Sequence, residues 1–292
     1  IKNLYETLSK RGYHVTFVPV DNDGRLDLDY LYKSLNDDTA IVSLMWANNE
    51  TGVIFPVEEI SREVKDRGII FHTDAVQAAG KIPIDVGTTG IAMLSLSGHK
   101  FHAPKGIGVL YVRKGTKFSP YMIGGHQEEG RRGGTENVAS IIALGKAAEL
   151  AKQNLDQNGY TAVGDLRDKL ETALLGRITN SMVNGDKEHR LPNTTSIAFE
   201  YVEGEAILLL MNEHGICASS GSACTSGSLE PSHVLRAMGV PFTAAHGSIR
   251  FSLSRYTTAG EIDFVIEKMP PIIERLRELS PFWKQEFEQK AN

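Results

Sequence analysis

Short apolar segments alternate with amphipathic segments along the first half of this chain. Residues 39–46 form a continuous apolar run, which is typical of a strand buried on both faces of a parallel sheet. An amphipathic helix is predicted over 56–67, with Gly68 as its stop, and further apolar runs occupy 69–71, 91–96 and 107–112. This alternation predicts an α/β fold with a right-handed, mostly parallel sheet.

The overall composition excludes several classes of protein. The chain has 292 residues, of which 41% are hydrophobic and 23% charged, so it is long enough for two domains. Its net charge of −5 argues against a nucleic acid or an anionic membrane as the main partner. The apolar runs are far shorter than the ~20 residues that a membrane span needs. Two cysteines do not make a disulfide framework, which predicts a reducing cytoplasm.

Turn-forming residues and hydrophobic periodicity predict the domain boundary and the remaining helices and strands. We predict a domain boundary at Asn158-Gly159, which separates a large domain (1–157) from a smaller one (158–292). Pro270-Pro271 is expected to kink or split the last helical segment. The other predicted segments are helices from residue 1 and over 27–35, 135–157, 162–175, 203–214 and 261–279, and strands over 14–20, 193–202 and 248–254.

Polar residues stand where two of the apolar runs end. Asp74 follows the first of them and could cap a helix, and Lys100 follows the second and could be a solvated surface charge. Pyridoxal phosphate needs a carboxylate at its ring nitrogen and a lysine, partly desolvated or near another cation, for its aldehyde. Strand ends that meet at one edge of a sheet would supply both groups.

Three stretches resemble the motifs of one family. His72-Thr73-Asp74-Ala75-Val76-Gln77 and Ser97-Gly98-His99-Lys100 are similar to the cofactor motifs of the cysteine desulfurases, which are pyridoxal-phosphate enzymes of the class V aminotransferase group. The stretch Ser219-Ser220-Gly221-Ser222-Ala223-Cys224-Thr225-Ser226 resembles the catalytic-cysteine loop of that family. The resemblance extends along essentially the whole chain and is closest to the nitrogen-fixation, NifS-type branch.

The resemblance implies a fold and a size. It implies fold type I of the pyridoxal-phosphate enzymes, in which a mostly parallel sheet flanked by helices forms a large domain beside a smaller α+β C-terminal domain. It also implies that on the order of a hundred residues of the family's N-terminal region are absent from this chain. In the family, that region carries a phosphate-binding turn and a histidine stacked on the cofactor ring.

The resemblance also assigns roles at the cofactor. Lys100 would form the Schiff base and Asp74 would keep the ring nitrogen protonated, while Gln77 would bind the phenolic oxygen. Ser97 and His99 would bind the phosphate, and His99 is a candidate base for the thiol of Cys224. Asn49 lies in a polar stretch that could be a plain loop, and the family places it at the phenolic oxygen or the substrate carboxylate.

Two further residues bear on the substrate and on assembly. The glycine-rich stretch 124–135 could be merely flexible, but its backbone N–H groups also suit a phosphate. In the family the threonine at the position of Thr135 reaches the phosphate bound to the other subunit, which implies a homodimer. Arg250 alternates with Ile249 and Phe251 on a strand, and its side chain could be solvated or could bind an α-carboxylate bidentately. The family uses it for the substrate.

The two cysteines have different settings. Cys217 lies in an apolar stretch and is predicted to be a small buried residue. Cys224 lies among small residues, so we expect an exposed thiol on a loop that can move. A metal site built from Cys217, Cys224, His214 and His233 has no CxxC pair and is disfavoured. We therefore expect no intrinsic metal, although the resemblance allows Cys224 to share a transient iron–sulfur cluster with a partner.

The expected reaction converts L-cysteine to L-alanine and leaves the sulfur as a persulfide on Cys224. An iron–sulfur scaffold protein would accept the sulfur, and the NifS-type branch would link the enzyme to nitrogenase assembly. Competing interpretations are a selenocysteine lyase, another class V aminotransferase, or an inactive fragment that lacks the cofactor.

Overall fold

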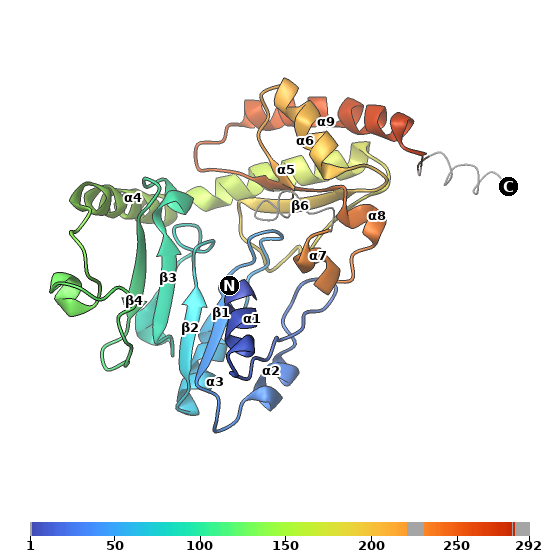
Figure 1. Ribbon diagram of the computed structural model, residues 1–292. Helices are drawn as coiled ribbons and strands as arrows, with labels where there is room; N and C mark the ends of the chain where they lie inside the picture. Colours follow the sequence, from blue (N-terminus) through green and yellow to red (C-terminus); the bar gives the residue numbers. More distant parts are fainter. Residues whose placement is uncertain (1, 221–230, 282, 284–292) are drawn as a thin grey trace.

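The computed structural model describes residues 2–220, 231–281 and 283 and contains two four-stranded sheets (Figure 1). The first sheet has the order β1 (Ile41–Met45), β2 (Ile70–Asp74), β3 (Met93–Ser97) and β4 (Gly108–Val112). Strands β1, β2 and β3 are parallel, and β4 is antiparallel to β3. The prediction of a mostly parallel sheet is therefore confirmed.

The second sheet is antiparallel and belongs to the C-terminal half of the chain. Its order is β5 (Ser181–Val183), β6 (Thr194–Phe199), β8 (Ser248–Ser252) and β7 (Ser219–Ser220). On β8 the predicted alternation is observed in part, because Ile249 and Phe251 are buried and Ser252 is exposed, but Ser248 is buried as well. The α+β character expected for the smaller domain is thus confirmed.

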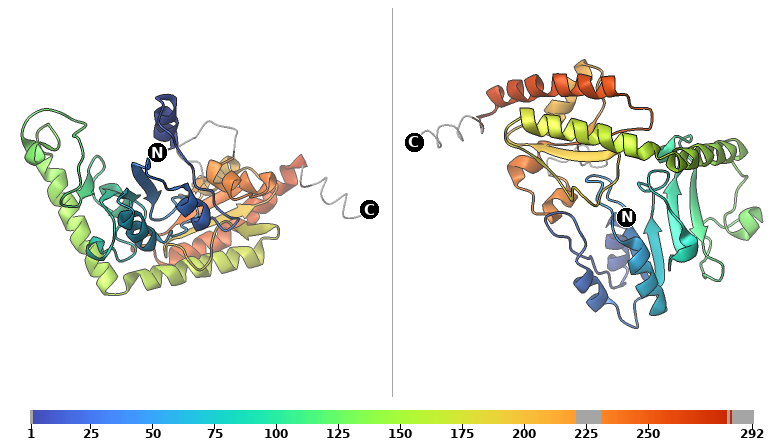
Figure 2. Two further views of the ribbon diagram at one scale, coloured as in Figure 1. Left: turned by 90° about the horizontal axis from the view of Figure 1, so that it is seen from below. Right: turned by 180° about the vertical axis from the view of Figure 1, so that it is seen from behind.

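Helices flank both sheets. The described helices are α1 (Lys2–Lys10), α2 (Leu28–Ser34), α3 (Val57–Asp66), α4 (Val138–Asp156), α5 (Gly159–Arg177), α6 (Gly204–Glu213), α7 (His233–Ala237), α8 (Phe242–Ala245) and α9 (Ala259–Leu279), with 3-10 turns η1 (Val86–Thr88), η2 (Gly98–Phe101) and η3 (Gln127–Gly130). Helices α4 and α5 follow each other along one side of the molecule (Figure 2). Asn158 lies between them with a left-handed φ of 54°.

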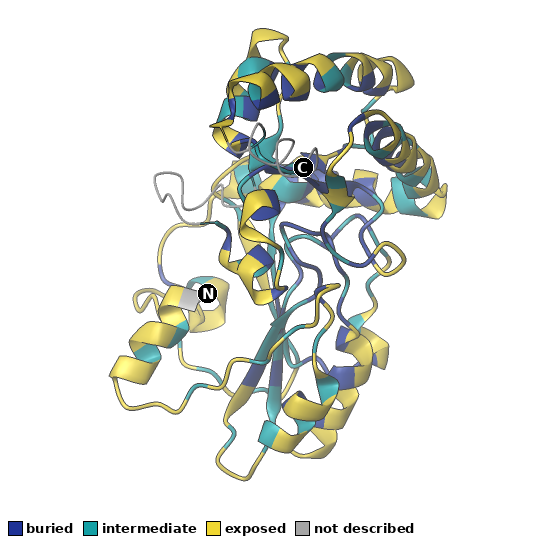
Figure 3. Cartoon of the chain, turned by 90° about the vertical axis from the view of Figure 1, so that its right-hand side faces the viewer, coloured by how far each residue is buried: buried dark blue, intermediate teal, exposed yellow. Residues whose placement is uncertain are grey.

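Each sheet has its own apolar core (Figure 3). Phe71 and Ile91 pack with Ile60 of α3 in the first core. In the second core, Leu170 of α5 and Ile266 of α9 enclose the buried strands of the second sheet. Apolar burial is the main stabilising contribution in each unit. The separate cores support a boundary at 157/158, which stays a prediction.

The structure corrects the predicted strand over 14–20. These residues pair only through an isolated bridge between Val20 and Leu26, because no described strand lies beside the rest of the segment. Alternating residues form a strand only where a neighbouring strand satisfies their backbone groups.

Helix α9 also differs from its prediction, because it runs unbroken through Pro270 and Pro271. Met269 on one side of the prolines and Ile272 on the other are both buried. Their packing outweighs the loss of the hydrogen bonds that proline cannot donate. Within the described chain, no helix has the length and apolarity required to span a bilayer.

Candidate active site

The first sheet presents a polar row on one of its faces. Strand alternation places Ser43, His72 and Ser95 on this face and Phe71 on the opposite, buried face. The imidazole of His72 is 2.8 Å from the Ser43 hydroxyl through Nδ1 and 2.9 Å from the Ser95 hydroxyl through Nε2. Burial lowers the pKa of His72, although the charge of Asp74 opposes that shift, so a neutral ring spans three strands.

Asp74 ends β2, two residues beyond His72 and on the same face. It is half-buried, and its backbone pairs in register with Ser95 of β3. Its Oδ1 accepts a hydrogen bond of 3.0 Å from the backbone N–H of Val76, so Asp74 caps the following turn. A carboxylate can accept several hydrogen bonds, so Asp74 can accept one from a further donor in addition to the one from Val76.

Lys100 lies on η2, which begins directly after β3. Its side chain is half-buried, whereas His99 beside it is exposed. The Ser97 hydroxyl is 2.8 Å from Nδ1 of His99, so the two residues that the resemblance assigns to the phosphate lie together. Asp74 is thus the last residue of β2, and Lys100 follows β3, its parallel neighbour.

Lys81 is a residue of this region that the sequence reasoning missed. It is only 8% exposed, and its Nζ donates a hydrogen bond of 3.4 Å to Oε1 of Gln77. Burial lowers the pKa of Lys81 to about 8, and the positive charges of Lys100 and Arg250 add to the shift. Lys100 and Arg250 are therefore both within electrostatic reach of Lys81. The sequence signal that could have indicated Lys81 is its position four residues after Gln77, in the turn that follows β2.

Arg250 brings the second sheet to the same region. Its Nη1 donates a hydrogen bond of 2.7 Å to the backbone carbonyl of Asn49, in the loop that follows β1. The guanidinium group is half-buried on β8. Asn49 and Arg250, the two residues expected at the substrate, are thus in direct contact across the two halves of the chain.

Glu50 is a second residue that the sequence reasoning missed. It is buried beside Asn49, and its carboxylate accepts a hydrogen bond from the hydroxyl of Ser232. Burial raises the pKa of Glu50 to about 7, although the Ser232 hydrogen bond and the charge of Arg250 act in the opposite direction. The acidic group therefore changes charge near neutral pH at the edge of the site.

Two predicted residues are not joined to this cluster. Thr135 is exposed between η3 and α4, and within the described chain no hydrogen bond links it to Lys100 or Asp74. Cys224 lies outside the described residues. Among the residues that are described, no group of histidine, cysteine or acidic side chains could hold a metal ion.

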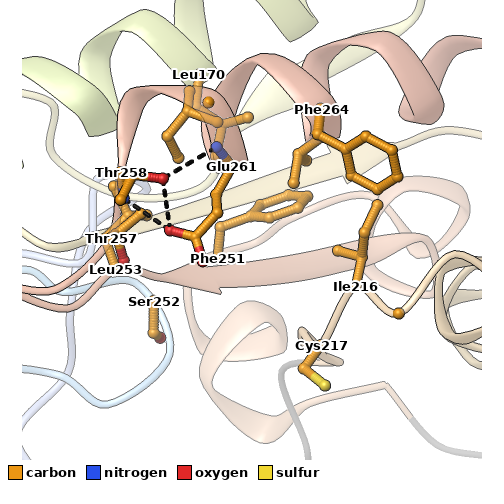
Figure 4. A pocket seen from close by; sticks show the side chains of 14 residues that line it. Leu170, Ile216, Cys217, Phe251, Ser252, Leu253, Thr257, Thr258, Glu261 and Phe264 are labelled. Carbon is orange, nitrogen blue, oxygen red and sulfur yellow. Dashed lines mark hydrogen bonds between the residues drawn. The ribbon is translucent and has the colours of Figure 1, made fainter.

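The structure corrects the prediction that Cys217 is buried. Its side chain is exposed, since α6 ends at Glu213 and Gly215 turns the chain so that Ile216 takes the packed position. Cys217 lines a cavity of about 540 Å³ between β8 and the start of α9, with Phe251, Phe264 and the capping Glu261 (Figure 4). Among the described residues that line this cavity, none is a candidate active-site residue.

The described side chains suit pyridoxal phosphate. A carboxylate and a lysine follow neighbouring strands, and a buried amine with two further cations forms a region of positive charge. The cofactor is an anion with an aldehyde and a basic ring nitrogen, so this donor set matches each of its groups.

Comparisons with known proteins agree with this chemistry. Residues 2–265 match the model of the family described as aminotransferase class-V. The chain is 62% identical over 283 residues to the cysteine desulfurase NifS of Azotobacter vinelandii, covering 97% of this chain and 70% of that protein. The chain belongs to the cysteine desulfurase family, in its NifS-type branch.

Solved structures show the same fold for this cysteine desulfurase family member. A protein described as NifS-like superimposes with a TM-score of 0.86 at 38% identity, over 93% of this chain and 71% of its own. SspA in complex with cysteine superimposes with a TM-score of 0.72 at 32% identity, over 88% of this chain and 71% of its own. The family depends on pyridoxal phosphate, and its fold type I is the one described above.

Proposed function

We propose that this chain carries the cofactor and substrate residues of a pyridoxal-phosphate-dependent cysteine desulfurase, which converts L-cysteine to L-alanine. The observation that carries the proposal is the convergence of Lys100 and Arg250 around the buried Lys81, with Asp74 at the end of the neighbouring strand. The cysteine bound to SspA, a solved relative, agrees with this choice of substrate.

Each residue has a task that follows from its position. When bound, pyridoxal phosphate draws electrons from the carbon atoms of the amino acid. Asp74 holds the proton of the ring nitrogen, and Lys100 holds the aldehyde carbon and, once freed, moves the proton at the substrate Cα. The fork of Arg250 binds the substrate carboxylate bidentately, and Asn49 fixes the guanidinium through its carbonyl oxygen.

The sulfur step balances without an external oxidant. The thiolate of Cys224 attacks the substrate sulfur, so an S–S bond forms and the C–S bond breaks. The thiol proton leaves Cys224, and a proton is returned to the carbon that lost sulfur. The sulfur is oxidised by as much as that carbon is reduced, which yields L-alanine and a persulfide. An unperturbed thiol has a pKa of roughly 8.5, so a base such as His99 is needed at neutral pH.

The assembly we propose is a homodimer. We propose that exposed apolar side chains before α4 and at its start form one surface, which we call the α4 face. Its residues are Tyr121, Met122, Ile123, Val138, Ile141 and Ile142. Thr135 lies within the same stretch of chain, where the family places a threonine that reaches the partner's phosphate. A second copy covering this face would bury these side chains and bring Thr135 to the other site.

The protein that accepts the sulfur and the cellular compartment are also proposals. An iron–sulfur scaffold protein is the proposed sulfur acceptor, and the NifS name of the Azotobacter relative supports a role in nitrogenase assembly. The cytoplasm is the proposed compartment, because a catalytic thiol must stay reduced.

One experiment tests the function. Pyridoxal phosphate is added to the purified protein, and absorbance at roughly 390–420 nm is followed, where a lysine-bound cofactor absorbs. Borohydride reduction and peptide mapping should place the cofactor on Lys100, and L-cysteine should then give alanine. A protein without the chromophore would be an inactive fragment. A protein that binds the cofactor but yields alanine only from selenocysteine would be a selenocysteine lyase, and one that exchanges amino groups would be an aminotransferase.

A further inference from the structure

Lys81 occupies an unusual environment for a lysine. The turn that carries it is covered by other elements, because Gly80 packs against Ala151 of α4 and Phe101 of η2. Its ammonium group has one described hydrogen-bond partner, the Oε1 atom of Gln77. A buried amine is therefore in contact with the side-chain amide of Gln77.

The charges around Lys81 are of one sign. Lys100 reaches it from η2 and Arg250 from β8, and in the described chain these are the charges that shift the pKa of Lys81. The positive charge of Lys81 in turn lowers the pKa of His102, after burial and the charge of Arg255. The two positive charges disfavour the protonated form of the buried Lys81, so a nearby anion or the loss of a proton would stabilise this arrangement.

The contact with Gln77 also sets the direction of its amide. An ammonium group can only donate, so the atom that faces Lys81 must be the carbonyl oxygen of the amide. The NH₂ group of Gln77 therefore faces away from Lys81, and no hydrogen bond from it to another described residue is found. A phenolic oxygen that carries negative charge requires a donor of this kind.

We propose that Lys81 is a positioning residue of the cofactor site, which orients the amide of Gln77 toward the phenolic oxygen and balances the anionic charge of the bound cofactor and substrate. This inference rests on the proposed function, because it requires Lys100 to hold pyridoxal phosphate. Its consequence is a coupling between cofactor binding and protonation at Lys81.

The coupling has a definite direction. Without the anion, the pKa of Lys81 is about 8, so near that pH about half of the amines lack a proton. An anion beside the amine raises its pKa, and the protein then takes up about half a proton at Lys81 when the cofactor binds. Below about pH 6 the amine is already protonated, and this contribution disappears.

The test compares three variants of the protein from which the cofactor has been removed. Pyridoxal phosphate is titrated into each by calorimetry near pH 8, in two buffers of different ionisation enthalpy, which gives the protons taken up. Lys81→Met should bind the cofactor about tenfold more weakly and take up about half a proton less. Lys81→Arg keeps a permanent charge, so it should keep the affinity and lose only the proton uptake. Lys65→Met, a change at an exposed lysine of α3, should behave as the wild type.

The outcomes separate this inference from the function on which it rests. A wild-type protein that forms no chromophore would refute the proposed function. A wild-type protein that binds the cofactor on Lys100, while both Lys81 variants match its proton uptake, would overturn the role of Lys81. If Lys81→Met does not fold, equal proton uptake by the wild type and Lys81→Arg is sufficient to overturn it.

Discussion

The carboxylate of Glu50 accepts a hydrogen bond from the hydroxyl of Ser232, 182 residues further along the chain. The same hydroxyl accepts a hydrogen bond of 3.1 Å from the backbone N–H of Val234 and so caps α7. Glu50 also follows Asn49, whose carbonyl oxygen binds Arg250. One buried acid therefore joins the loop after β1 to the start of α7.

This contact predicts a pH dependence of stability. Burial raises the pKa of Glu50 from 4.5 to about 7, so the folded protein holds this proton more tightly than the unfolded chain does. The free energy of unfolding therefore falls as the pH rises between these two values. Glu50→Gln should reduce the stability difference between about pH 5 and about pH 8 by on the order of 2 kcal/mol, measured by urea unfolding. Glu274→Gln, at an exposed position of α9, is the control, and an unchanged difference in Glu50→Gln would refute the assignment.

Arg250→Lys should weaken substrate binding. A lysine cannot form the bidentate contact with a carboxylate, nor can it reproduce the fixed contact with Asn49. The KM for L-cysteine should rise about tenfold with a smaller change in kcat, measured by alanine formation. Arg275→Lys, at an exposed position of α9, should leave the KM unchanged. An equal KM in Arg250→Lys would remove Arg250 from the substrate site.

The α4 face predicts which substitutions break the homodimer. Ile142 is 68% exposed on α4, and Leu209 is 70% exposed on α6. Ile142→Glu should dissociate the dimer, because a charge would be buried in an apolar interface. Leu209→Glu is matched in exposure and should leave the dimer intact, as measured by sedimentation velocity. Dissociation by Leu209→Glu alone would place the interface elsewhere.

The two cysteines should respond differently to the same substitution. Cys224→Ala should abolish alanine formation from L-cysteine while the absorbance of the bound cofactor persists, because the nucleophile is lost and Lys100 is not. Cys217→Ala should keep near-wild-type turnover, since the described residues that line the cavity with Cys217 include none that we place at the cofactor or the substrate. Turnover by Cys224→Ala would refute the persulfide mechanism.

The positions and ends of the four strands in the first sheet were predictable from the sequence, whereas the strand predicted over 14–20 was wrong and β5 and β7 were missed. The apolar run before Asp74 fixed β2, and the polar residues after it marked the edge of the sheet. Such signals are local, because a buried parallel strand needs continuous apolar residues and its loop does not. The pairing of Asp74 with Lys100 as one site came from the chemistry of the cofactor and from the resemblance.

The environments of Lys81 and Cys217 were not predictable in this way. Lys81 is buried because α4 and η2 cover its turn, and neither segment is near it in the sequence. Cys217 is exposed because the turn at Gly215 determines which neighbouring side chain faces the core. Both depend on tertiary packing, which a single sequence does not display.

The register of the first sheet has a consequence for how this chain can vary. Met45, Asp74 and Ser95 lie opposite one another on three parallel strands. Deleting one residue from β2 would rotate Asp74 onto the face where Phe71 and Thr73 are now enclosed. Exchanges of single side chains leave that alignment intact, whereas any change in the length of these strands would separate the acid from the lysine. These strands are therefore constrained in length more than in composition.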